Sequence, residues 1–122
     1  MSRNLFALAA AFRLSVTPPP AFAHAHLHAS DPAAGSTVAA SPEALRLTFS
    51  EPLELKGCAL TLAGPDGADS PLGALALDPA DGEILVAKPA APLKPGAHKV
   101  NWKALAKDMH RTEGGFSFTV RP

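Results

Sequence analysis

The chain of 122 residues carries 11 basic and 11 acidic side chains, so it lacks the basic excess that nucleic-acid-binding domains show. Apolar residues make up 47% of the chain, which is enough for the core of one small domain. No apolar run approaches the roughly 20 residues that span a bilayer, and the single cysteine, Cys58, cannot form an internal disulfide. We therefore expect a fold that is stabilised by packing alone and is not inserted in the membrane.

The first 23 residues are similar to a secretory signal peptide. A positive start precedes an apolar stretch at residues 5–12, and Ala21-Phe22-Ala23 fits a small-x-small cleavage site. Arg13 interrupts the apolar stretch and three prolines follow it, so a disordered N-terminal tail is the alternative interpretation. We predict that residues 1–23 are removed on export and that residues 24–122 form a single mature domain.

Beyond residue 24, apolar and polar residues alternate with period two, which is the pattern of half-buried β-strands. Strands are predicted, in chain order, at residues 24–29, 45–49, 58–62, 72–77, 83–87, 99–103 and 116–120. Turn signals such as Gly64-Pro65-Asp66-Gly67 separate them, and no helical stripe of useful length is present. The pattern predicts an all-β fold, a seven-stranded antiparallel immunoglobulin-like Greek-key β-sandwich of cupredoxin-like size.

Two residues need a separate interpretation within this pattern. Cys58 shares the parity of Leu60 and Leu62, which favours a small buried hydrophobe over a soft metal donor. Residues 93–98 are similar to the approach to a tyrosine corner, but His98 stands where that motif has Tyr. Whether the corner hydrogen bond forms is therefore open.

Three of the five histidines lie in His24-Ala25-His26-Leu27-His28, at the terminus that cleavage would create. In an extended strand these three imidazoles point to one face, whereas Ala25, Leu27 and Ala29 point to the other. Neutral imidazole is a good ligand for copper, nickel or zinc. An exposed polar face on an edge strand explains the same pattern, so the cluster alone leaves both interpretations open.

A carboxylate and an imidazole lie two positions apart in Asp108-Met109-His110, between a predicted strand and Gly114-Gly115. In an extended backbone their side chains project to the same side and can complete a coordination sphere that begins elsewhere. A turn with polar surface residues is the more frequent explanation of such a pair on its own.

The order of the short motifs along the chain resembles the CopC family of periplasmic copper-binding proteins. Each motif is weak alone, but together they span nearly all of the mature chain in the family's order. The motifs are His24-Ala25-His26-Leu27, residues 30–38 (SDPAAGSTV), Ser41-Pro42, residues 45–51 (LRLTFSE), residues 93–96 (LKPG), Val100-Asn101-Trp102, Asp108-Met109-His110 and residues 115–120 (GFSFTV).

The resemblance implies a periplasmic protein that binds Cu(II) at one end of a β-sandwich. In the family, the N-terminal His binds through its amine and its ring nitrogen, a histidine brace, and an Asp-x-His motif completes the site. By motif, the metal ligands are His24, Asp108 and His110, with His26 as an additional candidate. Cu(II) favours such nitrogen and oxygen donors. The amine has a reference pKa of about 8 and must lose its proton, so affinity is expected to fall in acid.

The resemblance also implies a non-enzymatic role in copper resistance and homeostasis, with an inner-membrane copper transport protein of the CopD type as partner. The chain departs from the family at two positions: His98 replaces the usual Tyr, and Met109 stands where Gly is frequent. Some members bind Cu(I) through a Met-rich stretch, but the mature chain here keeps only Met109. A thioether site for Cu(I) is therefore not predicted from the sequence.

Other functions compete with the copper carrier. Copper monooxygenases that act on polysaccharides also use an N-terminal histidine brace, but their substrate faces are rich in aromatic residues. Here the four mature aromatic residues, Phe49, Trp102, Phe116 and Phe118, lie on predicted core faces. A structural or adhesive sandwich with incidental histidines would bind no copper tightly. A Ser-His-Asp hydrolase is disfavoured because the chain has no Gly-x-Ser-x-Gly motif.

A second mode of holding Cu(II) competes with the brace. A histidine third from a free amine, as in His24-Ala25-His26, lets a flexible peptide bind Cu(II) through the amine, deprotonated backbone amides and the imidazole. Cleavage before His26 would put His28 third and preserve the motif. Because this mode needs amides that take no part in a β-ladder, we expect the brace in the folded domain near neutral pH.

Overall fold

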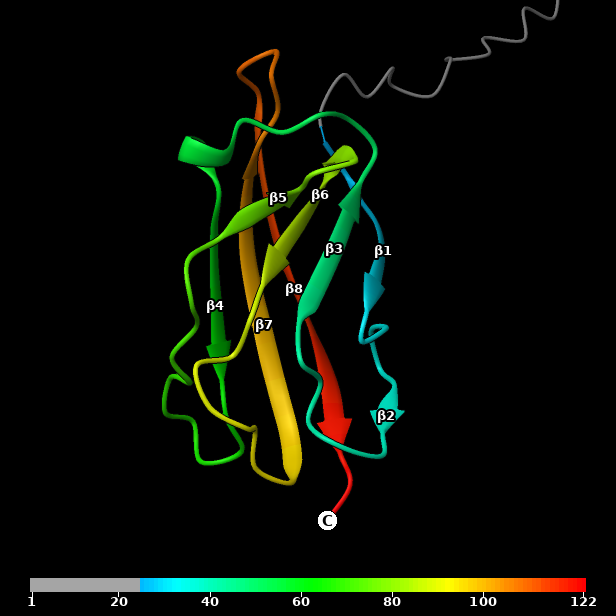
Figure 1. The fold of residues 1–122 in the computed structure, drawn as a ribbon, viewed down its shortest axis with the longest axis vertical. Coiled ribbons are helices and arrows are strands. Elements are labelled where there is room, and N and C mark those ends of the chain that lie inside the picture. Colours follow the sequence, from blue (N-terminus) through cyan, green and yellow to red (C-terminus); the bar gives the residue numbers. More distant parts are fainter. Residues whose placement is uncertain (1–24) are drawn as a thin grey trace, which may run out of the picture.

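Two four-stranded β-sheets form a sandwich in the computed structural model, which describes residues 25–122 (Figure 1). One sheet has the order β1-β3-β6-β5 and the other the order β2-β8-β7-β4. The strands are β1 Leu27–Asp31, β2 Thr37–Val38, β3 Leu45–Phe49, β4 Ala59–Ala63, β5 Ala76–Asp78, β6 Asp81–Ala87, β7 Gly96–Leu105 and β8 Arg111–Val120, and a short 3-10 turn, η1 Leu55–Gly57, follows β3. In this part of the chain, no helix is long and apolar enough to cross a membrane. The predicted all-β sandwich is confirmed.

The strand count and one pairing differ from the prediction. The described domain has eight strands rather than seven, because Thr37 and Val38 form the short strand β2 beside the end of β8. This pair is parallel, whereas the other strand pairs are antiparallel. Two residues are too few to show an alternation, so period-two analysis cannot identify such a strand.

The first strand begins later than predicted and contains a β-bulge. β1 starts at Leu27, and its register with β3 shifts between Leu27 and Ala29, which makes His28 the extra residue. A bulge interrupts the alternation of side chains between the two faces. Ala29 is consequently exposed, instead of sharing the inward face of Ala25 and Leu27 as predicted.

The strand predicted at residues 72–77 is shorter in the structure, where β5 covers only Ala76–Asp78. Leu72 forms an isolated bridge with Pro89 and does not continue the ladder. At the end of β5, Asp78 accepts a 2.6 Å hydrogen bond from Arg46 of β3, which holds the pKa of this carboxyl below its usual range. The ion pair thereby joins the two strands that flank β6.

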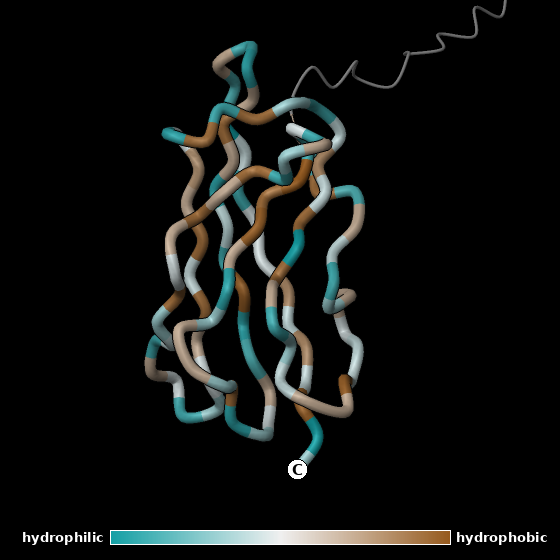
Figure 2. The backbone as a smooth tube through the Cα atoms, viewed as in Figure 1, coloured by the Kyte–Doolittle hydropathy of each residue, from teal (hydrophilic) through white to brown (hydrophobic). Residues whose placement is uncertain are grey.

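Alternate residues of the long strands build the core between the sheets. In β7, the even-numbered residues from His98 to Ala104 are buried and the odd-numbered residues between them are exposed. The four aromatic residues predicted on core faces, Phe49, Trp102, Phe116 and Phe118, are all buried. Trp102 packs edge-on against Phe49, with ring centroids 5.1 Å apart. Figure 2 shows the alternation of hydrophobic and hydrophilic residues along the strands.

His98 makes the hydrogen bond that a corner tyrosine makes in related sandwiches. The residue is 2% exposed, its Nε2 lies 2.7 Å from the carbonyl oxygen of Lys94, and its ring stacks on Phe118. A carbonyl oxygen only accepts, so Nε2 carries a proton and donates it. The corner contact that the sequence left open is therefore present, with an imidazole in place of the phenol.

Cys58 lies between η1 and β4 and is half-buried. Its side chain packs against the core, and Sγ donates a 3.4 Å hydrogen bond to the carbonyl oxygen of Glu54. The predicted inward orientation is thus confirmed, although the residue is less buried than the strand pattern suggested.

Gly114 offers a test of the packing around the only tryptophan. A β-carbon at Gly114 would lie 2.6 Å from Cζ2 of Trp102, whose ring is held by Phe49. We expect Gly114→Ala to lower the free energy of unfolding by about 1–3 kcal/mol through overpacking. Urea titration followed by Trp102 fluorescence measures this change.

Gly82→Ala is the matched control. A β-carbon at Gly82 meets nothing within 4 Å. We expect its free energy of unfolding to stay within about 0.5 kcal/mol of the wild type. Equal stabilities of the two variants would show that Trp102 is not packed as the structure places it.

Candidate metal centre

The hairpin that joins β7 to β8 carries the predicted Asp-x-His motif. Leu105 and Arg111 form the last pair of the ladder, and the amide of Ala106 donates a 3.0 Å hydrogen bond to the carbonyl oxygen of His110. The amide of Met109 closes the tip by donating a 2.9 Å hydrogen bond to the carbonyl oxygen of Ala106. Met109 has a φ of 74°, as expected for the last residue of a three-residue hairpin loop with a left-handed residue.

The two predicted ligands of this hairpin face each other. Oδ1 of Asp108 accepts a 3.1 Å hydrogen bond from the backbone amide of His110, and Oδ2 lies 3.1 Å from Nδ1 of the same residue. The side chains are 37% and 54% exposed, respectively, so a solvated ion can reach both. The amide hydrogen bond fixes the direction of the carboxylate, which leaves one oxygen and one imidazole presented together at the tip.

The start of the described domain is anchored beside this hairpin. Ala25 is fully buried, and its carbonyl oxygen accepts a 2.6 Å hydrogen bond from Oγ1 of Thr112, two residues beyond His110. The amide of the next residue, His26, donates a hydrogen bond to Oγ of Ser50, and the carbonyl oxygen of His26 accepts one from the Ser50 amide. Both hydrogen bonds are 2.9 Å long. Figure 1 shows the beginning of β1 and the β7–β8 hairpin at the same end of the sandwich.

The predicted ligands are only partly contained in the described residues. His24 lies outside residues 25–122, whereas His26, Asp108 and His110 lie within them and are exposed. Within residues 25–122, no three His, Cys, Asp or Glu side chains are grouped in a way that could hold a metal ion. His26 therefore does not complete a three-ligand group with Asp108 and His110, and its role as a ligand stays a prediction.

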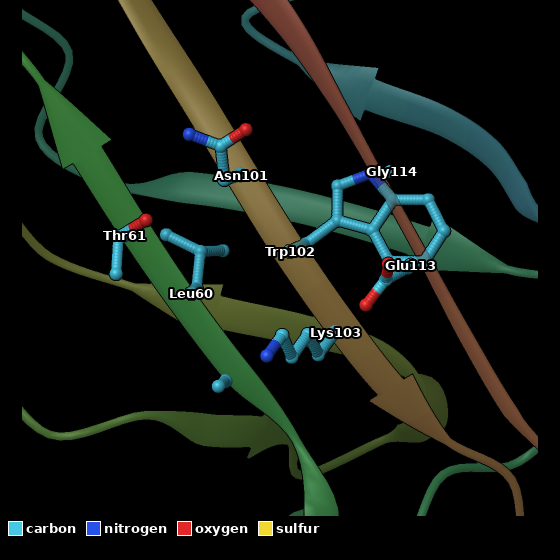
Figure 3. Close-up of a pocket in the computed structure, with 8 residues that line it drawn as sticks. Leu60, Thr61, Asn101, Trp102, Lys103, Glu113 and Gly114 are labelled. Carbon is cyan, nitrogen blue, oxygen red and sulfur yellow. The ribbon is translucent and has the colours of Figure 1, made fainter.

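A separate hollow of about 500 Å³ lies over β4, β7 and β8 (Figure 3), and no residue of the hairpin tip lines it. Its polar lining includes Thr61, Asn101, Lys103 and Glu113, and its lining residues contain no histidine or cysteine. This chemistry does not match a copper site, so the hairpin tip is the better candidate.

The comparisons with known proteins identify the family. Residues 27–121 match the profile described as the CopC domain. The chain belongs to the CopC family. It is 40% identical over 107 residues to "Copper resistance protein C" of Escherichia coli, which covers 83% of this chain and 84% of that protein. It is also 32% identical over 120 residues to "Protein YobA" of Escherichia coli K12, with 98% and 97% coverage.

Solved CopC structures share the fold. A crystal structure of CopC from Methylosinus trichosporium OB3b superposes with a TM-score of 0.75 at 27% identity, covering 81% of this chain and 95% of that one. PcoC from Escherichia coli, described as a methionine-rich copper resistance protein, superposes with a TM-score of 0.72 at 35% identity, covering 81% and 100%. The resemblance predicted from the motifs is confirmed, and the chain is a member of a copper resistance family.

Two polar residues at this end of the CopC fold were not identified from the sequence. Ser50 and Thr112 tie residues 25 and 26 to the sandwich, but neither stood out as part of a ligand motif. Thr112 is the second residue of β8 and follows His110 by two positions, and this spacing was the one available signal that it lies close to the ligand motif.

Met109 allows a stability test of the hairpin. A left-handed backbone costs a residue with a β-carbon about 1–2 kcal/mol, whereas Gly adopts it without strain. The greater conformational entropy of Gly in the unfolded chain offsets part of this gain. We therefore expect Met109→Gly to raise the free energy of unfolding by a net amount of about 0.5–1 kcal/mol. Thermal and urea unfolding measure the change.

The control, Met109→Ala, keeps the β-carbon and therefore the strain, and we expect it to give no such gain. If the Gly and Ala variants were equally stable, the hairpin would not hold residue 109 in the left-handed conformation.

Proposed function

We propose that this CopC chain is a periplasmic Cu(II) carrier for copper resistance and homeostasis. It holds Cu(II) through the amine and ring of His24, the carboxylate of Asp108 and the imidazole of His110, and it exchanges copper with an inner-membrane partner of the CopD type. The observation that carries this proposal is the facing pair of Asp108 and His110 beside the anchored start of the domain.

The donor set suits the cargo. Cu(II) prefers imidazole and amine nitrogens together with oxygen donors, in a tetragonal arrangement. The hairpin supplies one oxygen donor and one nitrogen donor, already held 3.1 Å apart. Because a metal site in which donors are positioned before binding loses less entropy on binding, the hydrogen-bonded hairpin favours tight binding.

The proposal requires that residues 1–23 are removed, so that His24 has a free amine. His24 directly precedes Ala25 in the chain and is joined to it by a peptide bond. Ala25 is buried and bonded to Thr112, close to His110 in the chain. The covalent geometry therefore supports a ligand role for His24, which itself lies outside the described residues.

The backbone contacts favour the brace over the peptide mode of Cu(II) binding. The peptide mode needs the amides of Ala25 and His26 as deprotonated ligands, but the His26 amide donates to Oγ of Ser50. Copper that binds the deprotonated His26 amide would have to break this hydrogen bond. We therefore propose that the folded domain uses the brace near neutral pH.

We propose a carrier without turnover. The four aromatic residues of the described domain are buried, so these residues do not form the flat aromatic face on which a polysaccharide could bind. The carboxylate of Asp108 beside His110 is an additional donor that retains Cu(II). A monooxygenase function is therefore not favoured by this geometry.

The ranking of two histidine variants tests the ligand set. We expect His110→Ala to weaken Cu(II) binding by about a hundredfold or more, because it removes a ligand from an exposed position without disturbing the core. His26→Ala should change the affinity less than about threefold, because the brace does not use that ring. Competitive Cu(II) titration at pH 7 on protein that begins at His24 measures both.

A third protein that retains Ala23 is the control for the amine. Its amine belongs to Ala23, so the brace cannot form and Cu(II) should bind more weakly. If His26→Ala lost more affinity than His110→Ala, with an all-nitrogen Cu(II) spectrum, copper would be held by the N-terminal peptide and not by the fold.

Thr112 is predicted to act as a positioning residue. Thr112→Val keeps the shape of the side chain but removes the hydroxyl that bonds Ala25, so the start of the domain is held less firmly. We expect Cu(II) affinity to fall by about tenfold, as for other residues that orient metal ligands. Thr119→Val, near the far end of β8, is the matched control and should bind Cu(II) like the wild type. Unchanged affinity in Thr112→Val would contradict the positioning role.

A further inference from the structure

Met109 has an unusual position for an apolar side chain. It is 70% exposed and is the one large hydrophobic side chain of residues 25–122 that is exposed. It lies at the hairpin tip between Asp108 and His110, and its backbone has the left-handed φ of 74° that Gly adopts without strain. Neither burial nor backbone geometry explains why a methionine occupies this position.

Thioether sulfur is a soft donor that selects Cu(I), whereas carboxylate oxygen is a hard donor that Cu(I) binds weakly. Imidazole binds copper in both oxidation states. The hairpin tip therefore presents, in three consecutive residues, a donor that favours Cu(II) (Asp108), a donor that favours Cu(I) (Met109) and a donor that binds both (His110). The exposed methionine side chain has three rotatable bonds and is not fixed by packing, so its sulfur can turn toward a metal bound to the next residue.

We propose that Met109 and His110 form a Cu(I) site at the hairpin tip, so that the same hairpin accepts copper in either oxidation state. This inference rests on the proposed function, because it uses His110 as a copper ligand. It departs from the sequence prediction, which gave no thioether site for Cu(I) because the mature chain keeps only Met109. The structure adds that this methionine is exposed and directly precedes His110 at the hairpin tip.

Cys58 is the other soft donor of the domain and the main competitor for this role. It is half-buried directly after η1, and its Sγ donates to the carbonyl oxygen of Glu54. Its packing against the core makes it a weaker candidate than Met109.

The test compares Met109→Leu with Cys58→Ala in protein that begins at His24. Leucine keeps the size, the apolar character and the β-carbon of Met109 and removes only the sulfur. Under anaerobic conditions, competition with a chromogenic Cu(I) chelator should show about tenfold or greater loss of Cu(I) affinity in Met109→Leu, and Cu(II) affinity should stay within about twofold. Cys58→Ala should bind Cu(I) like the wild type.

X-ray absorption of the Cu(I) form provides a direct readout. We expect a copper–sulfur distance in the wild type and in Cys58→Ala, and its loss in Met109→Leu. Unchanged Cu(I) affinity in Met109→Leu, or sulfur scattering that depends on Cys58, would overturn the proposal.

Cu(II) titration of His110→Ala keeps the two proposals distinguishable. If His110→Ala loses Cu(II) while Met109→Leu keeps Cu(I), the Cu(II) carrier stands and the thioether site is rejected. If Met109→Leu loses Cu(I) while His110→Ala keeps Cu(II), the proposed Cu(II) ligand set is rejected.

Discussion

Ten residues of β7 pair with ten residues of β8 in an unbroken antiparallel ladder that ends with Leu105 opposite Arg111. Alternate side chains of these two strands point into the core. The ladder leads directly into the hairpin that carries Asp108 and His110. Backbone hydrogen bonds therefore set the position of the candidate site relative to the core. The hydrogen bond from Thr112 extends the same constraint to the first residues of the domain.

The strands with a clear alternation could be predicted because one face of each meets the core and the other meets water. β3 has the predicted limits, residues 45–49, and β7 contains the predicted segment at its centre. Prediction failed where the alternation is short or interrupted. β2 has two residues, the bulge at His28 breaks the period, and Leu72 forms only an isolated bridge instead of a ladder.

The candidate site divides in the same way. Asp108 and His110 could be proposed from the sequence because they are two residues apart, and their contact is local. The hydrogen bond from His26 to Ser50 spans 24 positions of the chain, and the one from Thr112 to Ala25 spans 87. Such distant pairs depend on how the sheets assemble. The left-handed conformation of Met109 was also not predicted, because methionine gives no signal for a positive φ.

The edges of both sheets are poorly suited to pairing with a second molecule. β2 and β5 are only two and three residues long, and β1 carries a bulge and an exposed histidine. The remaining edge, β4, is partly covered by its own following loop, since the amide of Ser70 donates to the carbonyl oxygen of Leu62 and Ala63 bridges to Asp69. Short, bulged or covered edges hinder edge-to-edge strand addition. These features protect the sandwich against aggregation through its open edges.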